Sequence, residues 1–137
     1  MQDVDILMDK FHKSTSAGDG DMMVSCLSDQ FVFLGTDAEE RWERAPFESY
    51  ARERFSKGSS WTYKLLKRNV TKVSDSFYIF DESLKNSYLG TCRSTGSIVL
   101  QKGSLKLAQY SLSMPVPNDI ILGFVDQIMQ FEETQVK

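Results

Sequence analysis

The chain has 137 residues, of which 41% are hydrophobic and 26% are charged. We expect a single domain over residues 1–137, because a chain of this length buries about two thirds of its unfolded surface without disulfides or a structural metal. No apolar run approaches the roughly 20 residues of a membrane span. The net charge is −3, and the basic residues are scattered among acidic ones. We therefore expect no membrane and no nucleic acid as partner, since binding to a phosphate backbone needs a concentrated positive surface.

The start of the chain and its two cysteines indicate a cytoplasmic protein. The first residues, MQDVDILMDKF, lack the basic start and continuous apolar core of a secretory signal. Cys26 and Cys92 lie in different apolar settings without CxxC spacing, so we interpret them as buried free thiols. The acidic loop over residues 37–40 lacks the glycine and the alternation of a calcium loop. We expect no metal and no cofactor.

Three helices are predicted in the first half of the chain. Apolar residues recur at the spacing of one helix face at Val4, Leu7, Met8 and Phe11. This spacing predicts a helix over residues 4–17 that ends at Gly18, and a short helix over residues 19–27 follows. A third helix is expected over residues 46–57, because Pro46 suits a first helical turn and glycine follows the last residue.

The strands are predicted mainly in the second half. Five runs rich in aromatic and branched residues are expected to be strands: 31–35, 61–73, 76–84, 91–101 and 104–114. The last four are separated by short turns, as in an antiparallel meander. A final helix is expected after Pro117 and Asn118, with one apolar face formed by Ile121, Phe124, Val125 and Ile128. The pattern predicts an α+β fold in which helices cover the concave face of a curved, cone-shaped, four- or five-stranded antiparallel sheet.

Hairpin geometry predicts which side chains share a face of this sheet. A turn centred near Ser87 sets Asp81 opposite Arg93, and a turn centred near Asp75 sets Asp81 opposite Asn69. Odd-numbered residues then form a mixed aromatic and polar face, which is typical of a ligand pocket. A bulge near Gly96 would reverse this assignment. The ligand-binding candidates, including aromatic residues of the preceding segments, are Trp42, Tyr50, Trp61, Tyr63, Asn69, Arg93, Thr95, Gln109 and Ser111, and Asp81 is the candidate catalytic residue.

Five stretches in sequence carry a family resemblance: FLGTDAEERW at 33–42, WTY at 61–63, FDE at 80–82, CRSTG at 92–96 and AQYSLSMPVPND at 108–119. Over about residues 4–130 the chain resembles the SnoaL-like branch of the nuclear transport factor 2-like superfamily. The resemblance implies a cone-shaped, cystatin-like α+β fold with an internal pocket, commonly dimeric. That superfamily includes isomerases, polyketide cyclases, dehydratases and protein-binding transport factors, so the resemblance leaves the function open.

The charged candidates have alternative interpretations. In one interpretation Asp81 is a catalytic base and Arg93 holds the substrate by its charge. In the other, the two residues form a cross-strand ion pair that only stabilises the sheet. A carboxylate beside a guanidinium has a lowered pKa and is a poor base, which favours Arg93 as a ligand contact. Glu82, on the opposite face by parity, is expected to be exposed or at an interface. His12, the one histidine, is expected at the rim or on the surface, which leaves no histidine for covalent catalysis.

Three functions remain open from the sequence. The leading hypothesis is a domain that binds a small, partly apolar organic molecule, with an anionic or carbonyl group held by Arg93, Gln109 and Ser111. The second is a lyase or isomerase acting on a cyclic ketone or polyketide-like substrate with Asp81 as base. The third is a non-catalytic protein-interaction module, whose pocket would be filled by side chains. A homodimer through the outer face of the sheet is expected, because the last helix and the even-numbered face carry surplus apolar residues.

Overall fold

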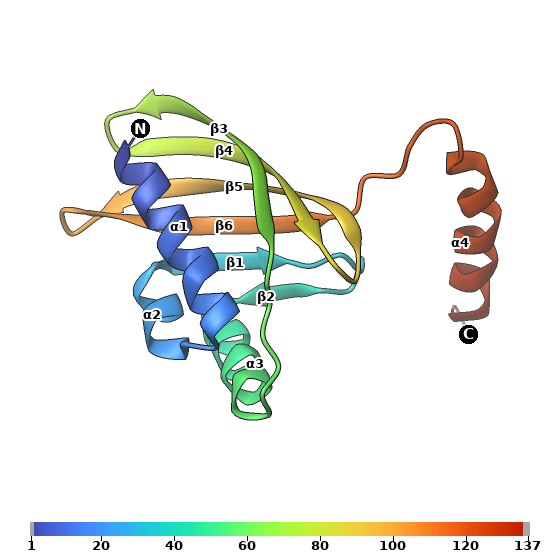
Figure 1. Cartoon of the computed structure of the whole chain (residues 1–137), viewed down its shortest axis with the longest axis horizontal. Helices are drawn as coiled ribbons and strands as arrows, with labels where there is room; N and C mark the ends of the chain where they lie inside the picture. The colour runs from blue at the N-terminus through green and yellow to red at the C-terminus, as the bar shows by residue number, and fades with distance from the viewer. Residues whose placement is uncertain (1, 136–137) are drawn as a thin grey trace.

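The computed structural model describes residues 2–135 and shows the expected α+β fold (Figure 1). In chain order, its elements are α1 (Gln2–Ala17), α2 (Gly20–Ser25), β1 (Leu27–Leu34), β2 (Arg41–Glu43), α3 (Arg44–Ser56), β3 (Lys64–Ser74), β4 (Phe77–Asn86), β5 (Gly90–Gln101), β6 (Ser104–Ser113) and α4 (Ile121–Gln135). Gly18 ends α1 with a φ of 69°, a conformation that glycine adopts without steric cost. Within residues 2–135, no helix is long and apolar enough to span a membrane.

The sheet has six strands in the order β2-β1-β6-β5-β4-β3. Strands β3 to β6 form the predicted antiparallel meander, and β1 joins β6 by a parallel pairing. The sequence predicted four or five strands because β2 has only three residues, too few to show a period of two. The sheet is curved and open, and α1 lies across one of its faces (Figure 1).

The core lies between α1, the start of α3 and the inner face of the sheet. All four apolar residues that predicted the first helix are buried: Val4, Leu7, Met8 and Phe11. They pack with side chains of β4, β5 and β6 in one continuous cluster. Full burial of an aliphatic or aromatic side chain contributes about 1.5–3 kcal/mol, so this helix face is a main source of stability. Both cysteines are buried free thiols, as predicted.

The face assignment from the sequence was wrong. Even-numbered residues of β4 and β5 point to the helices, and Phe80, Leu84 and Cys92 are buried among the core residues. Ile98, Tyr110 and Leu112, which were expected on an outer, partner-binding face, are buried as well. The reason is that strand parity groups residues onto one face but does not state which face the helices cover.

The register of the β4–β5 hairpin also differs from the prediction. Asp81 pairs with Thr95, and Arg93 pairs with Ser83, so Asp81 and Arg93 are not directly opposite each other. The turn is centred on Tyr88, one residue later than expected, which shifts each partner by two positions and preserves parity. The expected pairing of Asp81 with Asn69 is confirmed.

A bulge in β6 lies close to Gly96. Ser97 pairs with Gln109 but Ile98 pairs with Leu107, so one residue of β6 is left over between them. A Cβ atom on Gly96 would collide with the backbone oxygen of Gln109 and with the Phe80 ring. The absence of a side chain at residue 96 therefore allows the two strands and the Phe80 ring to pack closely.

We expect Gly96→Ala to lower the free energy of unfolding by about 2–3 kcal/mol, because neither the strand backbone nor the packed ring can yield freely. Urea unfolding followed by circular dichroism measures this loss. Gly123→Ala is the control, because a Cβ there meets nothing within 4 Å. Equal stability of Gly96→Ala and the unmodified protein would contradict the close approach.

Candidate functional site

An aromatic pocket lies between the inner face of the sheet, α1 and α3. It encloses about 200 Å³. Its lining residues come from both helices, from β1, β6 and two loops, and from the segment after α3: Phe11, His12, Thr15, Phe33, Gly35, Thr36, Glu40, Phe47, Tyr50, Trp61, Tyr63, Leu89, Tyr110 and Leu112. Apolar walls with a few polar groups are typical of a small-molecule site.

The walls of the pocket are built from rings in mutual contact. The Phe33 ring is stacked on Phe47, with centroids 4.7 Å apart, and is nearly parallel to the Tyr110 ring at 6.0 Å. Trp61 is stacked near Phe47 and Tyr50, with centroids 6.3 and 6.0 Å away. Such contacts hold rings in place, so the pocket has fixed, flat apolar surfaces.

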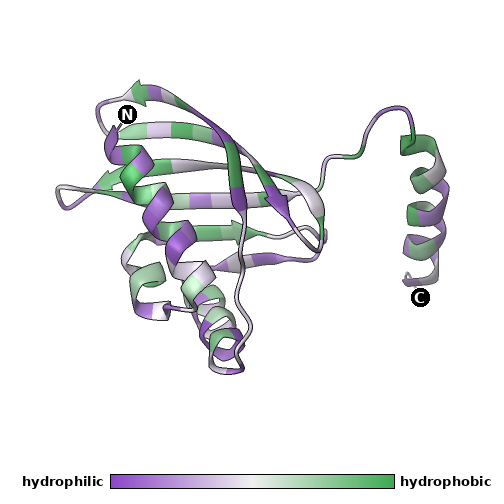
Figure 2. Cartoon of the chain, in the orientation of Figure 1, coloured by the Kyte–Doolittle hydropathy of each residue, from purple (hydrophilic) through white to green (hydrophobic). Residues whose placement is uncertain are grey.

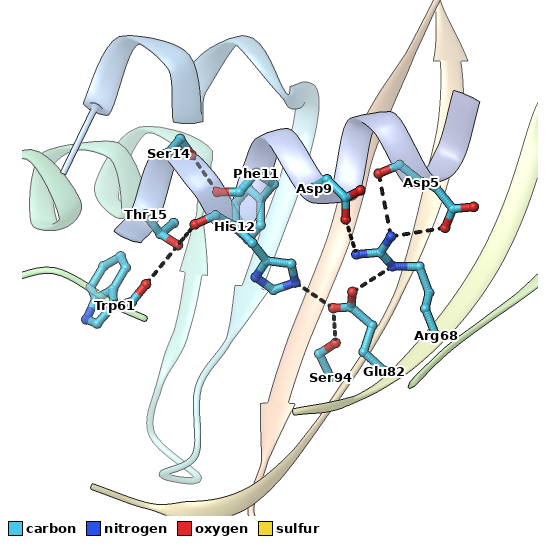
Figure 3. Close-up of polar contacts among 10 residues, drawn as sticks. All are labelled: Asp5, Asp9, Phe11, His12, Ser14, Thr15, Trp61, Arg68, Glu82 and Ser94. Atoms are coloured by element: carbon cyan, nitrogen blue, oxygen red, sulfur yellow. Dashed lines mark hydrogen bonds and ion pairs between the residues drawn. The ribbon is translucent and has the colours of Figure 1, made fainter. Parts of the chain in front are cut away.

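A buried carboxylate holds the one histidine at the pocket wall (Figure 3). Glu82 of β4 is only 1% exposed, and its Oε1 lies 2.8 Å from His12 Nε2. Ser94 Oγ donates a hydrogen bond of 2.7 Å to the same oxygen. An ionised carboxylate only accepts hydrogen bonds, so Nε2 carries the hydrogen and Nδ1 of a neutral ring has a free lone pair.

Arg68 of β3 binds the other oxygen of Glu82. Its Nε donates a 2.8 Å hydrogen bond to Glu82 Oε2, and its two terminal nitrogens each lie 3.0 Å from a carboxylate oxygen of Asp5 or Asp9 on α1. The guanidinium is only 5% exposed. Figure 3 shows Arg68 bridging the helix and Glu82. These contacts tie the sheet to α1 on both sides of the buried carboxylate.

The electrostatic balance keeps Glu82 ionised. Burial by itself raises the pKa of Glu82, but the hydrogen bond from His12, the charge of its ring when protonated, and the bonds from Ser94 and Arg68 outweigh it and lower the pKa below its usual range. Burial likewise lowers the pKa of Arg68, and its bonds to Asp5 and Glu82 more than compensate. The network is thus a paired set of charges in the core.

Two tyrosines of the pocket remain neutral hydrogen-bond donors. Burial, with a smaller contribution from Cys92, raises the pKa of Tyr63 to about 12. Burial and the nearby charge of Glu82 raise the pKa of Tyr110 well above its usual value. The Tyr110 ring packs edge-on against the His12 ring, with centroids 6.2 Å apart. The site therefore combines an imidazole with phenol groups inside apolar walls.

Only part of the predicted site lies at this pocket. Tyr50, Trp61 and Tyr63 line it, while Trp42 packs against Tyr50 with ring centroids 4.4 Å apart. The other predicted side chains lie on the opposite, outer face of the sheet: Asn69, Asp81, Arg93, Thr95, Gln109 and Ser111. Asp81 is exposed and accepts a hydrogen bond from Asn69 at 2.9 Å, so it does not reach the pocket.

Two residues at the pocket, Glu82 and His12, were not predicted there from the sequence. Glu82 was expected to be exposed and His12 to lie at the rim or surface, but they form a hydrogen-bonded pair at the pocket. A signal was available: Phe80, Glu82 and Leu84 alternate along one strand, so the carboxylate shares the face of two apolar residues. His12 directly follows Phe11, a residue of the predicted buried helix face.

No group of three or more potential metal ligands comes together within residues 2–135. The polar part of the site consists of the network around Glu82, the pocket hydroxyl groups and Glu40.

Solved structures with the same fold are known from several bacteria. A nuclear transport factor 2-like protein of unknown function from Pseudomonas putida superposes with a TM-score of 0.72 at 10% identity, covering 85% of this chain and 87% of its own. A cystatin-like domain of unknown function from Nostoc punctiforme has a TM-score of 0.72 at 10% identity and coverages of 97% and 89%. A provisionally assigned dehydratase of the nuclear transport factor 2-like family from Streptomyces avermitilis has a TM-score of 0.71 at 10% identity and coverages of 85% and 96%.

These likenesses define the fold class as nuclear transport factor 2-like, or cystatin-like. The sequence itself matches the SnoaL-like domain family over residues 4–117, and the chain therefore belongs to this family. A comparison with curated proteins finds none of significant sequence similarity. The family assignment confirms the resemblance seen in the sequence, and α4 lies beyond the matched residues.

We expect the buried carboxylate to make stability depend on pH. Because the folded-state pKa of Glu82 is lowered, its contribution is present above the ordinary glutamate pKa of about 4.3 and is lost as the pH falls through the folded-state pKa. Glu82→Gln should lower the free energy of unfolding by about 2–4 kcal/mol at neutral pH, since Arg68 loses a charged partner. Urea unfolding at neutral and acidic pH should show this difference shrinking in acid.

Asp81→Asn is the matched control, because the neighbouring carboxylate is exposed on the other face of the same strand. It should change the free energy of unfolding by less than about 0.5 kcal/mol. Equal losses in the two variants would show that Glu82 is not the buried, paired group.

Proposed function

We propose that the pocket binds a small, partly apolar organic molecule that contains a ring and a carbonyl group, and that His12 exchanges a proton with it. The observation that carries this proposal is the His12–Glu82 pair, which sets an oriented imidazole in the wall of an aromatic pocket. The proposed reaction class is proton transfer next to a carbonyl, as in isomerases and lyases.

The size and walls of the pocket support a small ring compound. Its volume of about 200 Å³ is below the roughly 300–1,000 Å³ of sites for drug-sized molecules, so one or two rings fit better than a larger ligand. Stacked rings such as Phe33 and Phe47 offer flat surfaces on which a planar ring can lie. An open pocket also argues against the third hypothesis from the sequence, in which side chains would fill it.

The orientation of His12 supports its role as a base. Glu82 accepts the Nε2 hydrogen and would stabilise the imidazolium that forms when Nδ1 takes a proton from carbon. Among the described residues, Nδ1 makes no hydrogen bond, and Figure 3 shows it on the side of the ring away from Glu82. Asp81 is excluded from this role by its position on the outer face.

The tyrosines support stabilisation of the resulting oxyanion. Removal of a proton beside a carbonyl places negative charge on its oxygen, and a fixed O–H donor in an apolar site lowers the energy of that charge. Tyr63 and Tyr110 both line the pocket and keep their protons near neutral pH. The provisional dehydratase assignment of the Streptomyces avermitilis protein is in line with proton-transfer chemistry in this fold.

We expect the protein to accelerate exchange of the acidic C–H protons of 2-tetralone for deuterium in heavy water, followed by proton NMR. This two-ring ketone is partly apolar and of the proposed class. His12→Gln removes the base and should lower the exchange rate by about 10²–10⁴-fold. Quenching of the tryptophan fluorescence, to which Trp61 in the pocket wall contributes, should show that the variant still binds the ketone, because the aromatic walls are unchanged.

Lys13→Gln is the control, since Lys13 is exposed on the same helix. It should exchange 2-tetralone at the wild-type rate. The proposal of proton transfer would be contradicted by an exchange rate that His12→Gln leaves unchanged. Binding of the ketone without any acceleration by the wild-type protein would instead support a non-catalytic binding domain.

A further inference from the structure

Helix α4 (Ile121–Gln135) stands apart from the rest of the molecule (Figure 1). None of its side chains is buried. The helix carries seven exposed apolar residues, with an eighth, Ile120, just before it: Ile121, Leu122, Phe124, Val125, Ile128, Met129 and Phe131 (Figure 2). A cluster of this size on one short helix marks an interaction surface.

The helix lacks the means to be stable alone in water. It has 15 residues and no basic residue in its last turn to balance the helix dipole. Isolated helices of about 12–15 residues are marginal in water, and protein helices gain most of their stability from packing of an apolar face. We infer that a surface of another molecule covers α4.

The segment before α4 keeps the helix away from its own domain. Residues 114–118 read MPVPN, and Pro115 and Pro117 both fix the backbone φ angle. Proline-rich segments are extended and semi-rigid, unlike the glycine-rich hinges that let a helix fold back. The linker therefore favours contact with a second copy over contact with the same chain.

The charge of α4 identifies the kind of surface that it fits. Residues 114–137 contain four acidic residues and one lysine and therefore carry a net charge of −3. This equals the net charge of the whole chain, so residues 1–113 are neutral as a whole. Three of the acids lie in the helix, at Asp126, Glu132 and Glu133. A complementary surface should combine exposed apolar residues with unpaired basic ones.

The outer face of the sheet has such a surface. Its basic patch consists of Lys64, Lys67, Lys85 and Arg93, all exposed. Within residues 2–135, none of the four makes a salt bridge. Further along β4, the outer face carries the exposed Ile79 (44%), which has the same parity as Asp81 and Lys85.

The strand register adds an energetic reason for a partner. Lys64 of β3 lies directly opposite Lys85 of β4. Like charges in directly opposed positions destabilise a pair of strands, and an acidic group from outside would relieve the repulsion. The domain itself supplies no acidic partner to either lysine among the described residues.

We propose that two copies of the chain exchange their C-terminal helices, so that α4 of each copy docks on the basic patch of the other. The apolar side of α4 would cover Ile79, and its carboxylates would lie beside the lysines. The contact is reciprocal, as a two-fold symmetric dimer requires. The proposal is independent of the proton-transfer function.

A charge-exchange experiment on the full chain tests this dimer. One variant carries Lys64→Glu and Lys85→Glu, and the other carries Asp126→Lys and Glu133→Lys. Sedimentation equilibrium should find the wild type dimeric at micromolar concentration. Each variant alone should dimerise more weakly, with a dissociation constant raised about tenfold or more. An equimolar mixture of the two should recover the affinity, because both contacts of the mixed dimer are complementary: one joins an unaltered helix to an unaltered patch, and the other joins a reversed helix to a reversed patch.

A matched control carries Lys13→Glu and Lys102→Glu, which change the charge equally at exposed positions outside the basic patch. It should dimerise like the wild type. Circular dichroism should confirm that every variant is folded, which is expected because all the altered side chains are exposed. A wild-type monomer at tens of micromolar would overturn the proposal, as would a dimer that both charge-reversal variants leave unweakened or a mixture without any recovery.

Discussion

The structure depends on one buried carboxylate. Glu82 sits on the inner face of β4 and accepts hydrogen bonds from His12 of α1, Arg68 of β3 and Ser94 of β5. A buried charge without partners would be too costly for a domain of this size, so all three elements must be in place together. Arg68 also binds Asp5 and Asp9, which fixes both the position and the rotation of α1 over the sheet. The same constraint that assembles the core therefore orients the imidazole at the pocket.

The pocket is a part of the core that the side chains leave open. Phe11 of α1 packs against the Tyr110 ring, while the adjacent His12 faces the cavity. On the far side, Phe47 and Tyr50 of α3 stand one helical turn apart, with Trp61 stacked near both. Ordinary packing thus supplies rigid aromatic walls, and the polar network behind them supplies a buried charge that orients His12. Binding and acid–base chemistry would share residues that the fold needs for its own stability.

Local patterns in the sequence predicted the helices and strands well. They predicted less well how distant segments pair and pack against one another. The spacing of Val4, Leu7, Met8 and Phe11 predicted the buried face of α1, because helix periodicity is a local property. Parity placed Asp81 and Thr95 on one face, but whether helices cover that face is decided by packing between distant segments. The one-residue error in the turn near Tyr88 created the false pairing of Asp81 with Arg93. Glu82 could have been found from its two apolar neighbours on the same face, Phe80 and Leu84.

The parallel pairing of β1 with β6 has a consequence for how the chain folds. Leu27 pairs with Leu107, and Val32 to Leu34 pair with Gln109 to Ser111, so β1 gains its inner neighbour only near the end of the SnoaL-like domain. Contacts between residues so distant in sequence slow folding, because a long loop must close before they form. During synthesis, α1, α2, β1 and α3 leave the ribosome well before the strand that completes their sheet. Until then Phe31 and Phe33 remain on an open strand, and at this stage the chain has most need of protection by chaperones.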